Sequence, residues 1–271
     1  MTIQQKLKEY QAEKKAVLAT NFYNLETLLA IVKAAILSEA PVILQLTKSS
    51  IEYIGLKQAV VMARQAIADY GIEGWLHLDH GDSIDLVQAC LDEGFDSVMI
   101  DASEKSFEEN IKITQEVVNR AKNYNANVEA ELGYVAKLGQ EQSGGFTTVA
   151  DASAFVRETG VDALAIAIGS AHGFYKSTPK LNIELLKEIH TSIETILVLH
   201  GSSGIPDEMV QEAIQNGITK VNLATEIKDT FMSCLKNTLK WSDEIDLRKV
   251  FPIATDAVMR LVCGKCELVN K

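Results

Sequence analysis

Residues 75–81 read WLHLDHG, and they place two ionisable side chains, Asp79 and His80, at the end of an expected strand. This unit of strand and loop is the one that repeats along the chain. Within this stretch two leucines alternate with a histidine and an aspartate, which is the period of a β-strand with two different faces. Gly81 interrupts the alternation, and Ser83 just after it is a residue type that caps the start of a helix. The sequence therefore predicts a strand that presents Asp79 and His80 at the mouth of a loop.

The same order of strand, loop and helix repeats along the chain. Strands are expected at residues 17–20, 41–46, 75–80, 97–101, 127–132, 163–168, 196–200 and 220–224. Helices are expected at residues 25–38, 56–70, 83–89, 107–122, 152–159 and 183–190. A further helix begins at residue 206, another follows the eighth strand and ends near residue 240, and the last covers residues 254–262. Eight alternating units near 250 residues favour an α/β fold, the (β/α)8 TIM barrel, as one domain over residues 1–271. The alternative is a doubly wound open sheet, which normally has fewer strands and a GxGxxG turn that this chain lacks.

Composition and charge narrow the class of protein. A hydrophobic fraction of 47% is ample for a buried core, and no apolar run reaches the roughly 18 residues that span a membrane. The first residues lack the apolar segment of a signal peptide, so a cytoplasmic protein is expected. The net charge of −11 argues against a nucleic-acid partner, because phosphate backbones are bound by clustered lysine and arginine. Small phosphorylated substrates stay open, since a few local groups hold one phosphate.

Three of the five histidines, His80, His172 and His200, fall at or just past the ends of three different strands. A TIM barrel has its active site at these carboxyl ends. Three neutral imidazoles with an open fourth position are typical of a catalytic zinc site, although each histidine alone is more often satisfied by a hydrogen bond. His77 lies two residues deeper than Asp79 and is expected to pack or to support a ligand rather than to bind metal.

The loops after the last two strands are typical of a phosphate site. Gly201-Ser-Ser-Gly204 follows the seventh strand, and Asn222-Leu-Ala-Thr225 ends the eighth at the start of a helix. Backbone N–H groups and hydroxyls in these two loops are the usual phosphate ligands of a barrel. Lys176, four residues past His172, adds a point charge.

Taken together, these motifs resemble the class II, metal-dependent ketose-bisphosphate aldolases, which include the fructose- and tagatose-bisphosphate enzymes. The resemblance covers nearly the whole chain, and its motifs occur in family order: HLDHG, SVMIDAS, FEENI, VEAELG, AIGSAHGFYK, LVLHGSSGIP and KVNLATE. It implies a TIM barrel, zinc, a small phosphorylated sugar as substrate, and a homodimer or homotetramer. A monovalent cation (Na⁺ or K⁺) commonly accompanies the phosphate in this family.

The resemblance also implies roles at the metal and in proton transfer. His80, His172 and His200 match the zinc ligands, and Asp79 matches the catalytic aspartate. Glu131 matches an alternative metal contact, and Asp101 matches a carboxylate near an alternative cation position. The phosphate and ketose contacts of the family are matched by Gly173, Lys176, Gly201, Ser203, Asn222, Ala224 and Thr225.

Two further matches are weaker. Residues 133–146 resemble the family's active-site loop, in which Glu141 matches an acid/base glutamate, but Leu138 and Gln142 depart from the loop's pattern. Arg260 aligns with an arginine of the terminal helix that holds the second phosphate in some members.

The expected reaction is the reversible cleavage of fructose 1,6-bisphosphate into dihydroxyacetone phosphate and glyceraldehyde 3-phosphate. The metal stabilises the enediolate as a Lewis acid. Asp79 exchanges a proton with the aldehyde-derived oxygen, Glu141 moves the proton at the enediolate carbon, and Asn222 hydrogen-bonds the enediolate. Tagatose 1,6-bisphosphate or another phosphorylated ketose is the alternative substrate.

Three other classes remain as rivals. A Schiff-base aldolase needs a buried lysine at a strand end, and Lys220 is expected only at the start of its strand. A two-metal barrel hydrolase usually has an HxH motif on strand one, where this chain reads VLAT. A catalytically silent barrel that serves as a partner subunit is the third.

Overall fold

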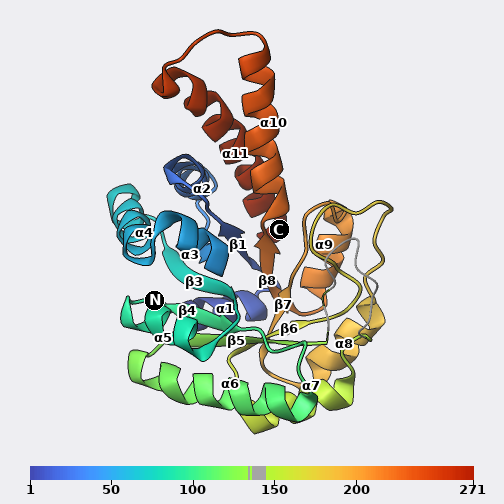
Figure 1. The fold of residues 1–271 in the computed structure, drawn as a ribbon. Helices are drawn as coiled ribbons and strands as arrows, with labels where there is room; N and C mark the ends of the chain where they lie inside the picture. The colour runs from blue at the N-terminus through green and yellow to red at the C-terminus, as the bar shows by residue number, and fades with distance from the viewer. Residues whose placement is uncertain (134, 136–144) are drawn as a thin grey trace.

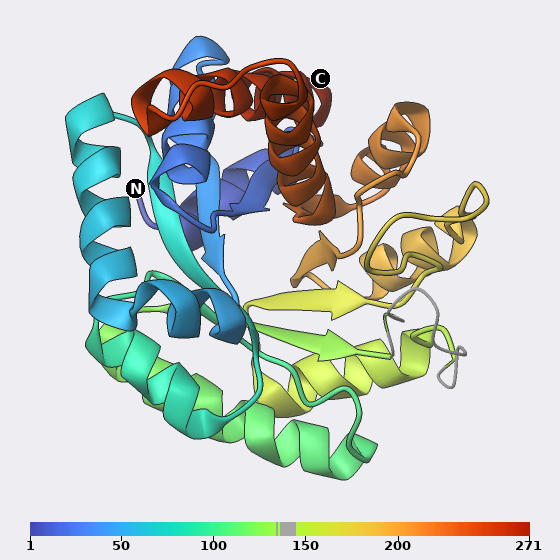
Figure 2. The same ribbon diagram turned by 45° about the horizontal axis from the view of Figure 1, so that its top comes forward.

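The computed structural model describes residues 1–133, 135 and 145–271. Strands β1 to β8 hydrogen-bond in sequence order into a closed barrel (Figure 2). All pairs are parallel, and β8 closes the barrel on β1. The (β/α)8 TIM barrel is therefore confirmed, and the open sheet is wrong. The strands are β1 (Val17–Asn21), β2 (Val42–Leu46), β3 (Gly74–Gly81), β4 (Ser97–Ile100), β5 (Asn127–Leu132), β6 (Ala163–Ile166), β7 (Ile196–Leu199) and β8 (Ile218–Leu223).

Helices surround the barrel on the outside (Figure 2). They are α1 (Ile3–Ala12), α2 (Leu25–Leu37), α3 (Lys48–Ile54), α4 (Leu56–Tyr70), α5 (Ile84–Asp92), α6 (Phe107–Ala121), α7 (Val149–Thr159), α8 (Ile183–Ser192), α9 (Asp207–Gln215), α10 (Thr225–Lys240) and α11 (Leu247–Val269), with a 3₁₀ turn at Lys122–Tyr124. The pair α10 and α11 projects away from the barrel (Figure 1), and α2 packs against α11. Within the described parts of the chain, no helix has the length and apolar character needed to cross a membrane.

Several elements differ from the sequence-based expectation. Helices α1 and α3 were not expected, and α11 begins seven residues earlier than residue 254. Pro252 lies inside α11, whereas proline usually ends a helix because it lacks an N–H donor. The eighth strand begins at Ile218 rather than at residue 220, which moves Lys220 from the start of the strand into the barrel.

The interior of the barrel has an apolar half and a polar half. Residues of β1, β2, β3, β6 and β7 form an apolar cluster with Ile3, Leu7 and Tyr10 of α1, which covers the amino-terminal end of the barrel. Nearer the carboxyl ends of the strands, the buried side chains are polar: Asn21, Gln45, His77, Asp79, Glu129, Glu131, Lys220 and Asn222. Burying so many polar groups is costly unless they bind one another or a ligand. The interior therefore marks one end of the barrel as the functional end.

The expected end of the third strand is confirmed in detail. A Cβ added at Gly81 would lie 2.5 Å from the Met99 carbonyl oxygen, so only glycine fits beside β4. Ser83 then caps α5, because its side chain accepts a hydrogen bond from the backbone N–H of Leu86. The strand therefore ends where Asp79 and His80 can face the barrel opening.

Candidate active site

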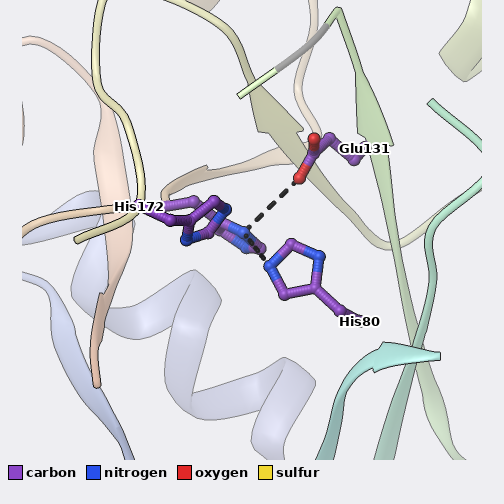
Figure 3. A group of neighbouring side chains, drawn as sticks. His80, Glu131 and His172 are labelled. Carbon is purple, nitrogen blue, oxygen red and sulfur yellow. Dashed lines mark hydrogen bonds and ion pairs between the residues drawn. The ribbon is translucent and has the colours of Figure 1, made fainter. Parts of the chain in front are cut away.

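The three histidines meet at the carboxyl end of the barrel. His80 is the second-last residue of β3, His172 follows β6, and His200 directly follows β7. One ligand atom from each lies within 4.8 Å of the others and of a carboxylate oxygen of Glu131. Figure 3 shows the side chains of His80, His172 and Glu131 pointing toward a common centre. The convergence expected from the sequence is present in the structure.

A bulge brings Asp79 and His80 to the same site although they are consecutive in a strand. The register between β3 and β4 shifts between Leu78 and Gly81, and His80 has a φ of +52°. Neighbouring residues of a regular strand face opposite sides, and a bulge redirects one of them. This left-handed conformation costs about 1–3 kcal/mol for a residue other than glycine. The strained backbone of His80 is what allows the side chains of Asp79 and His80 to face the same site.

Asp101 orients the imidazole of His80. Its Oδ2 atom lies 2.7 Å from His80 Nδ1, which leaves Nε2 facing the other histidines. Burial opposes the charged form of His80, but the charge of Asp79 and the hydrogen bond to Asp101 outweigh it and raise the pKa to about 9. Burial likewise opposes ionisation of Asp101, yet His80 holds the pKa of that carboxyl below its ordinary value. The two groups form a charged pair when no cation competes.

Glu129 orients the imidazole of His200 as Asp101 orients that of His80, but it contacts Nε2 instead of Nδ1. His200 is fully buried, its Nε2 lies 2.9 Å from Glu129 Oε1, and its Nδ1 lies 3.0 Å from His80 Nε2. Burial lowers the pKa of His200 below its ordinary value, so this ring is neutral. A neutral His200 that donates from Nε2 to Glu129 has its lone pair on Nδ1, toward the centre of the cluster.

His172 and Glu131 complete the group. Burial, followed by the charge of His80, lowers the pKa of His172 to about 3. Burial and the charge of Asp101 raise the pKa of Glu131 to about 8. Glu131 Oε2 lies 3.5 Å from His200 Nδ1 and has no hydrogen-bond partner among the described residues. A buried oxygen without a partner, beside three imidazoles, fits a bound metal ion.

Asp79 lies beside the histidines and is held by two amides. Asn21 Nδ2 donates to Asp79 Oδ2 at 2.9 Å, and Asn222 Nδ2 donates to Oδ1 at 3.3 Å. Burial opposes ionisation of Asp79, but the charges of His80 and Lys220 and the hydrogen bond from Asn21 bring its pKa below the ordinary value. Asp79 is therefore an ionised carboxylate 4.0 Å from His80 Nε2.

These groups lie in or under a cavity of about 780 Å³. Most of the residues predicted for the site line it: Asp79, His80, Asp101, Glu131, His172, Gly173, Gly201, Ser203, Asn222, Ala224 and Thr225. One side is formed by the loop after β7 and by the amino-terminal end of α10, which begins at Thr225. A Cβ at Gly201 would lie 2.4 Å from the Ala171 carbonyl oxygen. That glycine lets the loop after β7 approach the loop after β6, which carries His172.

The chain matches the sequence model described as "Fructose-bisphosphate aldolase class-II" over residues 1–271. It belongs to this aldolase family.

Solved structures agree with the family assignment. The YdjI aldolase from Escherichia coli K12 superposes with a TM-score of 0.89 at 31% identity, covering 98% of this chain and 96% of the other. A candidate fructose-1,6-biphosphate aldolase from Coccidioides immitis gives 0.89 at 27% identity, covering 98% and 95%. Fructose-bisphosphate aldolase from Campylobacter jejuni gives 0.83 at 20% identity, covering 99% and 95%, and shows the shared fold.

Two exposed residues matched to the aldolase family, Lys176 and Arg260, are not among the described residues that line this cavity. Arg260 lies on α11. Glu141 lies outside the described residues, as does most of the loop that resembles the aldolase active-site loop.

The structure adds functional residues that the sequence did not assign. Asn21 binds Asp79, Glu129 binds His200, and Lys220 lies between Glu129 and Asn222. The expectation that Lys220 starts its strand is wrong, because β8 begins at Ile218, and the Lys220 side chain is only 1% exposed, inside the barrel. The signal was available: Lys220 and Asn222 are two residues apart, so a strand directs both side chains to the same face.

Proposed function

We propose that this chain is a zinc-dependent aldolase that reversibly cleaves fructose 1,6-bisphosphate into dihydroxyacetone phosphate and glyceraldehyde 3-phosphate. The observation that carries the proposal is the convergence of His80, His172 and His200 on one point beside an ionised Asp79. Membership of the class II fructose-bisphosphate aldolase family supports the reaction class and the choice of substrate.

Three imidazole nitrogens with a nearby carboxylate are the donor set of a catalytic zinc site. His80, His172 and His200 would hold the ion, and Glu131 is near enough to join them. When bound, zinc supplies Lewis-acid stabilisation of the negative charge that develops on the ketose oxygens, worth several kcal/mol.

The side chains around this site supply proton transfer and orientation. Asp79 is ionised and lines the cavity, so it accepts the proton of the hydroxyl that becomes the aldehyde oxygen and returns it in the reverse direction. Asn222 lies next to Asp79 and offers an amide N–H to the developing enediolate oxygen. Glu141 remains our proposal for the acid/base at the enediolate carbon.

The wall between the β7 loop and α10 suits a phosphate. Gly173, Gly201, Ser203 and Thr225 line this part of the cavity, and the first backbone N–H groups of α10 have no partners within the helix. Such a helix start attracts an anion. We propose that the phosphate of the ketose binds here, with a Na⁺ or K⁺ ion as its companion.

The deciding experiment is a side-by-side cleavage assay of the purified chain with zinc. Fructose 1,6-bisphosphate is expected to be cleaved fastest, ahead of tagatose 1,6-bisphosphate, which differs only in configuration at C4. Treatment with a chelator should abolish activity, and zinc should restore it. Borohydride added with substrate should trap no adduct, because Lys220 is paired with Glu129 and is not among the described residues that line the cavity.

Each rival reading has its own outcome in this assay. Faster cleavage of tagatose 1,6-bisphosphate would change the substrate but keep the reaction class. A trapped adduct on Lys220, with activity that survives the chelator, would establish a Schiff-base aldolase instead. A chain that binds zinc but cleaves no phosphorylated ketose would be a silent partner subunit.

A further inference from the structure

A lysine and a glutamate are buried together beneath the histidines. Lys220 is 1% exposed and Glu129 is fully buried, and Lys220 Nζ lies 2.9 Å from Glu129 Oε2. We propose that Glu129 and Lys220 are positioning residues that fix the orientations of His200 and Asn222. This inference rests on the proposed zinc-dependent function.

The contact of Glu129 with His200 determines which ring nitrogen is free. Lys220 Nζ lies 2.9 Å from Glu129 Oε2, so the glutamate is held as a carboxylate opposite an ammonium group. An ionised carboxylate only accepts hydrogen bonds, so His200 must donate from Nε2 across the 2.9 Å contact. The lone pair is then on Nδ1, the nitrogen that faces His80. Without Glu129, the other tautomer would place a hydrogen where a metal must bind.

The contact of Lys220 with Asn222 determines which way the amide points. Lys220 Nζ donates to Asn222 Oδ1 at 2.8 Å. Because an ammonium group only donates, the oxygen of the amide must face Lys220. The amide nitrogen is thereby turned toward Asp79 and His200, at 3.3 Å from Asp79 Oδ1 and 3.1 Å from His200 Nε2. Lys220 thus presents Asn222 as a donor on the side of the cavity.

Stability alone does not account for this arrangement. A buried ion pair often contributes no more stability than apolar residues of similar size, because both charges lose their hydration. Every contact that the structure gives to Lys220 Nζ and to the carboxylate of Glu129 involves the barrel interior: Asn222, His200, His77 and each other. The pair connects a proposed metal ligand to a proposed substrate contact.

Two double variants separate the two roles, and both avoid leaving a single unpaired buried charge. Glu129→Leu with Lys220→Met removes the acceptor for His200 and the donor for Asn222. Glu129→Gln with Lys220→Met keeps an oxygen acceptor for His200 but still removes the donor for Asn222. The matched control is Lys6→Met with Glu73→Gln, which removes an ion pair of 3.1 Å formed by α1, at the opposite end of the barrel.

The readouts are zinc affinity by competition with a chromophoric chelator, the visible spectrum of the Co²⁺-loaded protein, and kcat and KM. The leucine variant is expected to lose about 10–100-fold in zinc affinity and to show an altered Co²⁺ spectrum. The glutamine variant should recover most of the affinity while its kcat stays low with little change in KM, because a donor used in the transition state is lost. The control should match the wild type in all readouts.

Several results would overturn the proposal. Wild-type zinc affinity and Co²⁺ spectrum in a folded leucine variant would remove the role of Glu129. Wild-type kcat in the glutamine variant would remove the role of Lys220, and this result remains available if the leucine variant does not fold. A wild-type protein that binds no zinc would instead contradict the proposed function, so the two failures are distinguishable.

Discussion

In the metal-free protein, His80 carries a positive charge that the proposed metal ion would replace. Its pKa of about 9 makes it an imidazolium at neutral pH in the metal-free protein. It then donates from Nδ1 to Asp101 and from Nε2 to the free lone pair of His200 Nδ1. Both bonds require a proton on each nitrogen of His80, while a metal requires Nε2 to be bare. A proton and the proposed metal ion would therefore compete for Nε2 of His80.

Zinc affinity is accordingly predicted to rise with pH. Because the folded-state pKa of His80 is raised to about 9, a proton must be displaced at every pH below that value. One displaced proton lowers the apparent affinity about tenfold per pH unit. The affinity should increase about 100-fold between pH 6 and 8, and calorimetry in two buffers of different ionisation enthalpy should detect the released proton. An affinity that is flat over this range would contradict the assignment.

Asp79→Asn is predicted to lower kcat about 10²–10⁴-fold, the usual contribution of a general base. The substitution keeps the size of the side chain but removes the proton acceptor that Asn21 and Asn222 hold in place. Zinc affinity, measured by chelator competition, should change little, because Asp79 is not one of the grouped ligands. The exposed aspartate variant Asp92→Asn is the control. Full activity in Asp79→Asn would remove Asp79 from the proposed mechanism.

At the scale of the elements, helix α1 has a structural role. Leu7 is fully buried among apolar side chains at the amino-terminal end of the barrel. Leu7→Ala is predicted to lower the free energy of unfolding by about 2–5 kcal/mol, because it leaves a cavity. Urea unfolding measures this loss, and zinc affinity should stay unchanged. Lys8→Ala, on the exposed face of α1, should have neither effect.

A Leu7→Ala variant with normal stability would show that α1 is not a packed part of the barrel. A variant with normal stability but weakened zinc binding would show that α1 supports the proposed site at the carboxyl end of the barrel and not the stability of the fold. Barrels in general place catalytic groups at the carboxyl ends of the strands and stability at the other end.

The sequence predicted the strands well but not the bulge in β3. Periodicity located β5 at its observed bounds, Asn127–Leu132, since strand alternation and flanking turns are local signals. The inward turn of His80 depends on the register between β3 and β4 and on a positive φ. These features arise from pairing with a distant strand, and periodicity within one strand does not contain them.

The buried polar contacts show the same limit. The sequence predicted His80, His172, His200 and Asp79 as site residues from their positions at strand ends, because a barrel brings those ends together. The partners Glu129 and Lys220 are on different strands, 91 positions apart, and their 2.9 Å contact follows only from the closed register of the barrel. The sequence therefore predicted the proposed metal ligands and the proposed base, whereas the contacts that orient them depend on pairing between distant strands.

At the scale of the whole molecule, the barrel unites three separated segments into one proposed metal site. His80, His172 and His200 come from β3 and from the loops after β6 and β7. Loss of any one ligand should therefore weaken zinc binding while leaving the other two in place. Glu129, Asp101 and Lys220 remain as supports around them.

The most direct test is to titrate zinc into chelator-treated protein and to record bound zinc and aldolase activity together. Activity is predicted to be absent at the start, to rise in proportion to bound zinc, and to level off at one zinc per chain. His172→Ala in the same titration should bind zinc far more weakly and regain little activity. Full activity of the zinc-free protein, or tight zinc binding by His172→Ala, would contradict a metal site built from these three histidines.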